Sequence, residues 1–183
     1  MLARNFPNTF HKKRLSFHPD FIVDSVRDID FVFLQKAGIK AILLDLDGTI
    51  VARGTATIPN DIVKCLRAQP LKIYIATNRP KSNDLKKIKI SLGAAGVIHP
   101  RGLIGKPFPR YFAQAAHNHG LNPRECVMVG DRFLQDIFGA NAAGMTTVAV
   151  RKLDKPINAS DRFLSGLEAR ISNQLAKRYT KLR

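Results

Sequence analysis

Short apolar runs alternate with amphipathic stretches between residues 40 and 151. Each apolar run is four to six residues long and rich in Ala, Val, Ile or Leu, which is typical of a strand buried on both faces of a parallel sheet. We therefore expect about five parallel strands. They are predicted at 40–45, 72–77, 96–99, 126–130 and 146–151.

Amphipathic stretches separate these runs and indicate helices, three of which end at a glycine, as many helices do. The four predicted helices are Pro59–Ala68, Ser82–Leu92, Pro109–His119 and Phe133–Ala143. Strands that alternate with helices form right-handed βαβ crossovers, which place helices on both faces of a parallel sheet. The sequence thus predicts a three-layer, Rossmann-like α/β fold. Upstream, residues 17–30 are expected to be irregular and Phe31–Lys36 to form a short helix.

Polar residues are unusually frequent just after the predicted strands and just before the helices that follow them. In an open parallel sheet, ligands bind outside the carboxyl ends of the strands. A functional site is therefore expected where these residues gather, with carboxylates, a hydroxyl group and a lysine at one edge of the sheet. The candidate site residues are Asp45, Asp47, Thr77, Asn78, Lys106, Asp131 and Asp136.

Carboxylates that lie close together repel one another, and their burial is costly unless a positive charge lies between them. A hard divalent cation such as Mg²⁺ satisfies this requirement and also binds substrate phosphate oxygens. Asp45 and Asp131 are the expected side-chain ligands, while Asp47 can offer its backbone carbonyl and keep its carboxyl group for proton transfer. Lys106 can hold phosphate as a point charge. Thr77 can offer a hydroxyl group, and Asn78 an N–H group, to a phosphoryl oxygen.

Each of these motifs also fits a plainer structural role when taken alone. Asp47 or Thr49 could cap a helix, Thr77-Asn78 could form a turn, and Lys106 could lie in a solvated loop. Gly130-Asp131-Arg132 could likewise begin a surface helix. The motifs occur together, however, each at a strand end or a helix start, and this arrangement favours a catalytic site.

These motifs resemble those of the haloacid-dehalogenase (HAD) superfamily of aspartate-nucleophile phosphatases, over about residues 40–150. The resemblance implies a phosphatase that uses Mg²⁺ and has a Rossmann-like fold. It also implies that Thr77 and Lys106 orient the phosphoryl group, with Asn78 beside them. The matching motifs are DLDGT at 45–49, Thr77, Lys106 and GDRFLQD at 130–136.

The same resemblance implies a role for each aspartate. Asp45 would attack phosphorus to form an aspartyl-phosphate, and Asp47 would protonate the leaving alcohol and then activate water. Asp45, Asp47 and Asp131 would bind Mg²⁺, and Asp136 would order the residues around the ion.

Motif spacing indicates that no cap domain of appreciable size covers the site. Only 27 residues separate Thr49 from Thr77, and a loop, one helix and one strand use them up. Another 28 separate Thr77 from Lys106, and a helix and a short strand use these up. This layout and the segment Pro19–Ile29 are similar to the capless YqeG-type branch of the superfamily, subclass IIIA, which includes phosphatidylglycerophosphate phosphatases. Many members of that branch have D-N-T where this chain has Asp47-Gly48-Thr49, and Ser-Asn-Asn where it has Thr77-Asn78-Arg79.

Charge is concentrated at the two ends of the chain. The 183 residues carry 30 Lys and Arg against 14 Asp and Glu, a formal net charge of +16, which favours an anionic partner. Residues 1–15 hold four basic and no acidic residues, and 151–183 hold nine basic against three acidic residues. We expect a basic leader at 1–16, a catalytic domain at 17–156 and a basic amphipathic helix at 157–183.

Cys65 and Cys126 lie far apart with no metal-ligand spacing, and we expect both to be buried free thiols in a reducing compartment. No apolar run is long enough to span a membrane. The predicted location is cytoplasmic, with peripheral membrane contact or mitochondrial targeting left open by the acid-free leader. The sequence predicts no oligomeric state.

Three functions remain compatible with the sequence. The first is a Mg²⁺-dependent phosphomonoesterase at an anionic membrane, acting on a lipid such as phosphatidylglycerophosphate. The second is the same chemistry on a soluble phosphate or a nucleic-acid end. The third is a basic nucleic-acid- or ribosome-binding module on the same scaffold, which the complete set of catalytic side chains disfavours.

Overall fold

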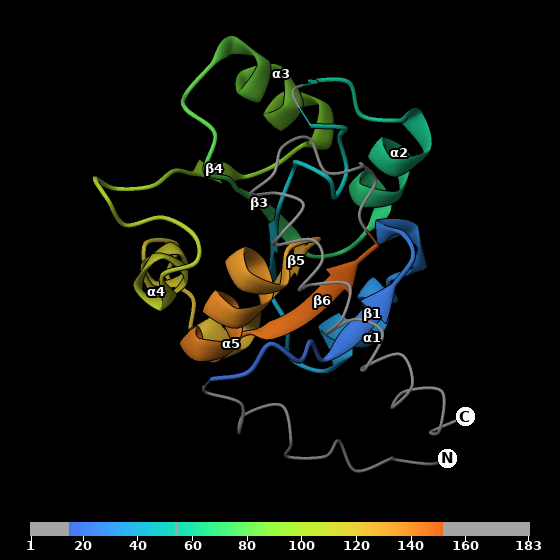
Figure 1. Cartoon of the computed structure of the whole chain (residues 1–183). Helices are drawn as coiled ribbons and strands as arrows, with labels where there is room; N and C mark the ends of the chain where they lie inside the picture. The colour runs from blue at the N-terminus through green and yellow to red at the C-terminus, as the bar shows by residue number, and fades with distance from the viewer. Residues whose placement is uncertain (1–14, 54, 152–183) are drawn as a thin grey trace, which may run out of the picture.

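A computed structural model describes residues 15–53 and 55–151 (Figure 1). In this part of the chain a six-stranded, fully parallel sheet has the order β1-β6-β5-β2-β3-β4. The predicted leader, except for residues 15 and 16, and the predicted C-terminal helix lie outside the described residues. The strands are β1 (Phe21–Val23), β2 (Ala41–Leu44), β3 (Lys72–Ala76), β4 (Gly96–Ile98), β5 (Cys126–Gly130) and β6 (Thr146–Val150).

Both faces of the sheet are buried, which explains why its strands appear in the sequence as continuous apolar runs. Successive side chains of a strand point to opposite faces. In β2, Ile42 and Leu44 pack into one hydrophobic cluster, and Ala41 and Leu43 pack into another. All four side chains are at most 1% exposed.

Helices on each face complete the three layers. The helices are α1 (Phe31–Lys36), α2 (Asn60–Ala68), α3 (Asn83–Leu92), α4 (Pro109–His117) and α5 (Gly139–Ala143). The first three contribute to the cluster that contains Ile42, and α4 and α5 contribute to the cluster that contains Leu43. Figure 1 shows α4 and α5 on one side of the sheet and α1 and α2 on the other. The predicted three-layer fold is confirmed, and no large cap is present within the described ranges.

No described helix is long and apolar enough to cross a lipid bilayer.

The expectation that residues 17–30 are irregular is wrong, because this segment contains β1 and a 3₁₀ turn at Val26–Asp28. A three-residue strand is too short to show a periodic pattern, and long-range contacts hold it in place. The side-chain amide of Asn141 donates to the carbonyl oxygens of Ser16 and His18 at 2.7 and 2.9 Å. The Asp20 amide donates to the Thr147 carbonyl at 3.0 Å. These bonds place β1 beside β6 as a sixth strand.

The predicted helix Phe133–Ala143 is divided into a π-helical turn, Phe133–Phe138, and α5. The wide turn carries Asp136, which is 0% exposed. The backbone amide of Arg132 donates to Asp136 Oδ2 at 3.1 Å. Turns of this kind often occur at functional sites. Helical periodicity in the sequence does not reveal the hydrogen bond between Arg132 and Asp136.

We expect Gly139→Ala to destabilise the protein, although alanine is the better helix former. A Cβ atom at this position would lie 2.3 Å from the Pro107 carbonyl oxygen and 2.4 Å from Phe112 Cε2. Overpacking of this kind costs about 1–3 kcal/mol. Chemical denaturation will measure the loss, and an increase in the free energy of unfolding would show that helix propensity outweighs this close approach.

Candidate active site

The site lies at the carboxyl end of β2. At this strand the order of the sheet changes direction, because β3 and β4 lie on one side of β2 and β5 and β6 lie on the other. Strand β2 has β3 on one side and β5 on the other, and its last residue, Leu44, pairs with Ile75 and Val129. The residues that follow these three strands therefore meet at one edge. They include Asp45, Thr77 and Asp131, as expected for a ligand site at a topological switch point.

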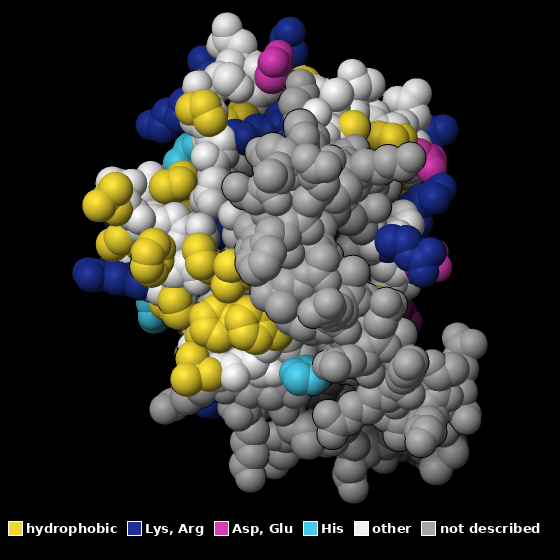
Figure 2. Space-filling view, viewed as in Figure 1, with side chains coloured by type: hydrophobic (Ala, Val, Ile, Leu, Met, Phe, Trp, Pro, Cys, Tyr) yellow, Lys and Arg dark blue, Asp and Glu magenta, His cyan; other side chains and the backbone are white. Residues whose placement is uncertain are grey.

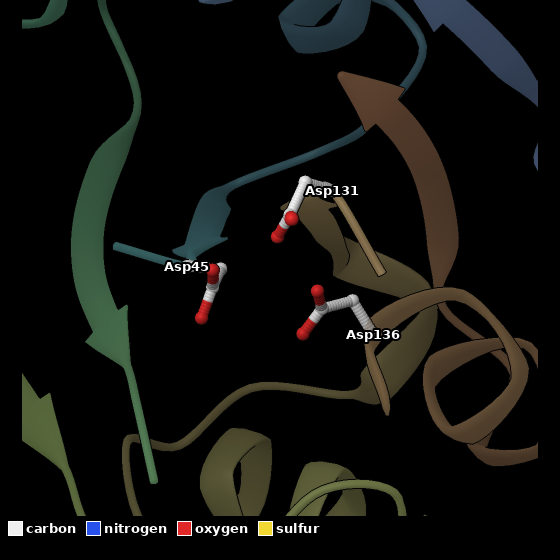
Figure 3. A group of neighbouring side chains, drawn as sticks. All are labelled: Asp45, Asp131 and Asp136. Carbon is white, nitrogen blue, oxygen red and sulfur yellow. The ribbon is translucent and has the colours of Figure 1, made fainter. Parts of the chain in front are cut away.

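Three carboxylates converge in the space shown in Figure 3. Asp45, Asp131 and Asp136 each offer a carboxylate oxygen, and these oxygens lie within 4.8 Å of one another. The three residues are 5%, 5% and 0% exposed. The Thr49 hydroxyl lies between two of them, at 3.2 Å from Asp45 Oδ2 and 3.3 Å from Asp131 Oδ1. A single hydroxyl proton can serve only one of these acceptors at a time.

Lys106 places its ammonium group among these acids. Its Nζ donates to Asp45 Oδ1 and, at 2.8 Å, to Asp136 Oδ1, and its side chain is 3% exposed. Burial disfavours the charged form, but the carboxylates of Asp136 and Asp45 outweigh burial and raise the pKa of Lys106. The lysine therefore remains a permanent cation within the cluster.

The environment of Asp45, by contrast, disfavours the charged form of its side chain. Burial raises its pKa to about 6, against the opposing attraction of Lys106, and Asp136 and Asp47 raise it further. A carboxylate that is desolvated and still ionised near neutral pH is well suited to nucleophilic attack.

The charges of this cluster fit a divalent cation. Three buried carboxylates face one lysine ammonium group, which leaves two negative charges in a place where uncompensated charge is costly. The donors are all oxygen atoms, the type that Mg²⁺ prefers. Gly48 also allows the loop to approach closely, because a Cβ at its φ of +81° would lie 2.6 Å from Asp131 Oδ2.

Asp47 has a partner that the sequence did not indicate. The Arg79 guanidinium binds both of its oxygens, with Nε at 2.7 Å from Oδ2. Arg79 also donates to the Thr55 carbonyl oxygen at 2.9 Å. Its hydrogen bond to Asp47 raises the pKa of Arg79, while burial opposes this shift. A bidentate pair fixes the orientation of the carboxylate.

Thr77 and Asn78 fix the backbone around the site. The Thr77 hydroxyl accepts a hydrogen bond from the Arg79 amide at 3.0 Å. The Asn78 side chain bonds to the loop that carries Lys106, because its Nδ2 donates to the Lys106 carbonyl and its Oδ1 accepts from the Lys106 amide, both at 3.1 Å. Asn78 thus couples the end of β3 to the loop that precedes α4.

These side chains surround a cavity of about 250 Å³. Five predicted residues line it: Asp45, Asp47, Thr77, Asn78 and Lys106. Four lining residues were not predicted: Arg53, Arg79, Arg132 and Gln135. All four lie within four residues of Thr49, Thr77 or Asp131, so proximity to a motif is the only signal the sequence offers for them.

The chain is similar to known phosphatases along most of its length. It is 26% identical over 165 residues to the probable phosphatase YqeG of Bacillus subtilis, covering 87% of this chain and 89% of the relative. It is 27% identical over 179 residues to phosphatidylglycerophosphate phosphatase 1 of Arabidopsis thaliana, covering 93% of this chain and 50% of the relative. The chain thus spans half the length of that plant protein.

A solved structure supports the fold. The HAD phosphatase of Thermococcus onnurineus superposes with a TM-score of 0.52 at 24% identity, covering 66% of this chain and 90% of the neighbour. The HAD-hydrolase-like family model matches residues 103–152, a segment that includes Lys106, Asp131 and Asp136. The motifs that suggested this family are brought together in space by the fold, and the comparisons support a phosphatase that is similar to the HAD-like hydrolases.

Proposed function

We propose that the protein is a Mg²⁺-dependent phosphomonoesterase that acts through an aspartyl-phosphate on Asp45. The observation that carries this proposal is the position of Asp45 in the cavity wall, in contact with Lys106 and among the Asp131 and Asp136 carboxylates. A phosphoryl group that enters the cavity reaches the Asp45 carboxylate next to both a fixed cation and an oxygen-rich metal site.

The first half-reaction forms a bond between an Asp45 oxygen and phosphorus while the bond from phosphorus to the alcohol oxygen breaks. For this step the Asp47 carboxyl group carries a proton, which it gives to the departing alcohol. In the second half-reaction, water attacks the phosphorus of the aspartyl-phosphate, Asp47 takes a proton from that water, and the bond to Asp45 breaks. Inorganic phosphate leaves, Asp45 is again a carboxylate, and Asp47 again carries the proton that it gave to the alcohol.

The surrounding residues position these groups. Lys106 offsets the repulsion between the Asp45 carboxylate and the phosphoryl oxygens. Arg79 holds the carboxylate of Asp47 in one orientation. Asn78 keeps the Lys106 loop against the end of β3. Thr77 contributes a buried hydroxyl beside the nucleophile.

The residues that would hold Mg²⁺ are Asp45, Asp131 and the backbone carbonyl of Asp47, with Asp136 beside them. Bound there, the ion neutralises negative charge on the phosphoryl group and on the clustered carboxylates.

Phosphatidylglycerophosphate is a substrate to test first, because the Arabidopsis relative is named for it. Two surface features fit an anionic lipid surface, one through charge and the other through apolar contact. On the face shown in Figure 2, Lys and Arg side chains are spread along the periphery among few acidic ones. The apolar side chains of Leu103 and Phe108, on either side of Lys106 in the chain, are 96% and 55% exposed.

Phosphate release from a panel of phosphomonoesters tests the proposed activity. The panel contains short-chain phosphatidylglycerophosphate, sugar phosphates and 5′-phosphorylated oligonucleotides, each assayed with Mg²⁺ and with EDTA. We expect Mg²⁺-dependent release from at least one class and loss of activity in EDTA that Mg²⁺ restores. Equal rates in EDTA would contradict the metal requirement, and no release from any substrate would contradict the function.

A further inference from the structure

We propose that a second pocket, between β4 and α4, binds a nucleoside phosphate, either free or at the end of a nucleic-acid strand. Within the described part of the chain, this pocket shares no lining residue with the catalytic cavity. Binding there does not depend on the proposed phosphatase reaction, which leaves the pocket unused.

The second pocket lies at an edge of the sheet, where β4 is the last strand and pairs with β3. Residues of β4, of α4 and of the loop between them line it (Figure 1). Its volume is about 350 Å³, within the roughly 300–1,000 Å³ of typical ligand pockets. It is larger than the catalytic cavity of about 250 Å³, so it can hold more than a single phosphate.

The charge of this pocket is positive. Lys81 and Arg101 line it, and among the described residues no Asp or Glu does. Neither cation forms an ion pair within residues 15–53 and 55–151. Positive charge that no neighbouring acid offsets attracts anions to a hollow in the surface. Both residues are exposed, which suits contact with a phosphate group that remains partly in water.

Backbone hydrogen bonds hold Arg101 at the wall of the pocket. Its amide donates to the Ile104 carbonyl oxygen, and the Ile104 amide donates to the Arg101 carbonyl oxygen, both at 3.0 Å. Ile104 in turn packs against the hydrophobic cluster that contains Leu43. Because the backbone is already fixed, an anion that binds has only the Arg101 side chain to order, which lowers the entropic cost.

An imidazole offers a surface for a planar ring. His119 lines the pocket and stacks on Tyr74, with ring centroids 4.0 Å apart and an angle of 27° between the planes. Tyr74 is 7% exposed and supports one face of the imidazole. Because His119 itself is exposed, a second planar ring that enters the pocket can stack against it, as nucleobases do on aromatic side chains.

Two side-chain amides can bind the polar edge of such a ring. Gln114 and Asn118 line the pocket and are four positions apart at the end of α4, so they lie on the same face of the helix. An amide offers both donors and an acceptor, the combination with which Asn and Gln bind nucleobases. The apolar residues Val97, Ile98 and Ala115 line the same pocket and can cover the faces of the ring.

A matched set of ligands tests whether both parts of a nucleotide are bound. Adenosine 5′-phosphate (AMP) has the base and the phosphate, adenosine lacks the phosphate, and ribose 5-phosphate lacks the base. We expect AMP to bind at least about tenfold more tightly than either fragment, because each fragment loses one kind of contact. Equal affinities for AMP and ribose 5-phosphate, or no binding of AMP at millimolar concentration, would overturn the proposal.

Calorimetry in EDTA restricts this measurement to the second pocket. Without metal, the three buried carboxylates of the catalytic site outnumber the Lys106 ammonium by two charges, and they repel phosphate. The second pocket, lined by Lys81 and Arg101, needs no metal to attract it. Binding of AMP that requires Mg²⁺ would overturn the proposal, since the nucleotide would then occupy the catalytic cavity.

Variants assign the binding to these residues. Lys81→Gln and Arg101→Gln should each weaken AMP binding about tenfold without changing that of adenosine, and His119→Ala should weaken both about tenfold. Lys86→Gln is the matched control, because Lys86 is exposed on α3 and does not line the pocket; it should change neither. AMP binding that is unchanged in Arg101→Gln and His119→Ala would place the site elsewhere and overturn the proposal.

A 5′-phosphorylated adenosine trinucleotide distinguishes the two sources of this ligand. An affinity about tenfold higher than that of AMP would support the end of a strand, since contacts beyond the pocket would then add to binding. An affinity equal to that of AMP would support a free nucleotide. None of these measurements uses turnover, so a protein without phosphatase activity would still confirm or contradict the second pocket.

Discussion

Asp45→Asn should abolish phosphatase activity while leaving the protein folded. Loss of the nucleophile removes the covalent route, and replacement of a nucleophile in other hydrolases lowers kcat by about 10⁴-fold or more. Phosphate release from the best substrate of the panel will measure the loss. Asp24→Asn is the control, because Asp24 is an exposed partner of Arg151 at the end of β1, and it should retain parental activity.

The covalent intermediate gives this prediction a second measurement. Parent protein quenched in acid during turnover of a ³²P-labelled substrate should retain label that neutral hydroxylamine releases, and Asp45→Asn should retain none. Label on the variant, or parental turnover by it, would place the nucleophile elsewhere.

In the absence of metal, Asp45→Asn should make the protein more stable, although the same substitution abolishes activity. The pKa of Asp45 is raised from 3.8 to about 6 by burial, so its contribution to stability is present below pH 3.8 and is lost as pH rises through 6. At pH 8 in EDTA, Asn removes this penalty, and the free energy of unfolding should rise by at most about 3 kcal/mol. The free energies of unfolding of the parent protein and Asp45→Asn should converge near pH 4. Mg²⁺ should stabilise the parent more than the variant.

Lys106→Met should cause the largest loss of stability among single changes at the site. It leaves the carboxylates of Asp45 and Asp136 buried without the ammonium that contacts both. Removal of one partner of a buried ion pair costs about 3–5 kcal/mol. Activity should also fall at least about 10²-fold, because the phosphoryl oxygens lose a fixed positive charge.

The pH dependence identifies the cause of this loss. Without Lys106, burial and mutual repulsion raise the carboxylate pKa values in the folded state, so their contribution to stability is lost as pH rises. Denaturation in EDTA should therefore show a gap between parent and variant that is large at pH 8 and smaller at pH 5. Lys36→Met, on the exposed surface of α1, should cost little at either pH. A gap of constant size would indicate lost packing instead of uncompensated charge.

Much of the fold could be predicted because its signals are local. The buried parallel strands appear as apolar runs; the predicted strand at 126–130 matches β5, and the short helix at Phe31–Lys36 matches α1 at both ends. The first strand, Phe21–Val23, could not be predicted, because it is defined by bonds to residues more than 120 positions away, such as those from Asn141 to Ser16.

The candidate site divides in the same way. Asp45, Thr77 and Asp131 could be expected at one edge because each follows a parallel strand, and the direction of those strands determines which ends meet. The partner of each charge could not be predicted. The contact of Asp47 with Arg79 spans 32 positions and that of Lys106 with Asp45 spans 61.

The sequence by itself determined the order of the five later strands and the helices between them, the chemical types of the residues at the site and the excess of positive charge. Periodicity and residue type carry this information, because they act over neighbouring positions. Only the tertiary structure decided which carboxylate pairs with which cation, how deeply Asp45 is buried and where Arg53 and Arg132 lie. These properties arise from desolvation and from distances between segments far apart in the chain, which depend on how the layers pack.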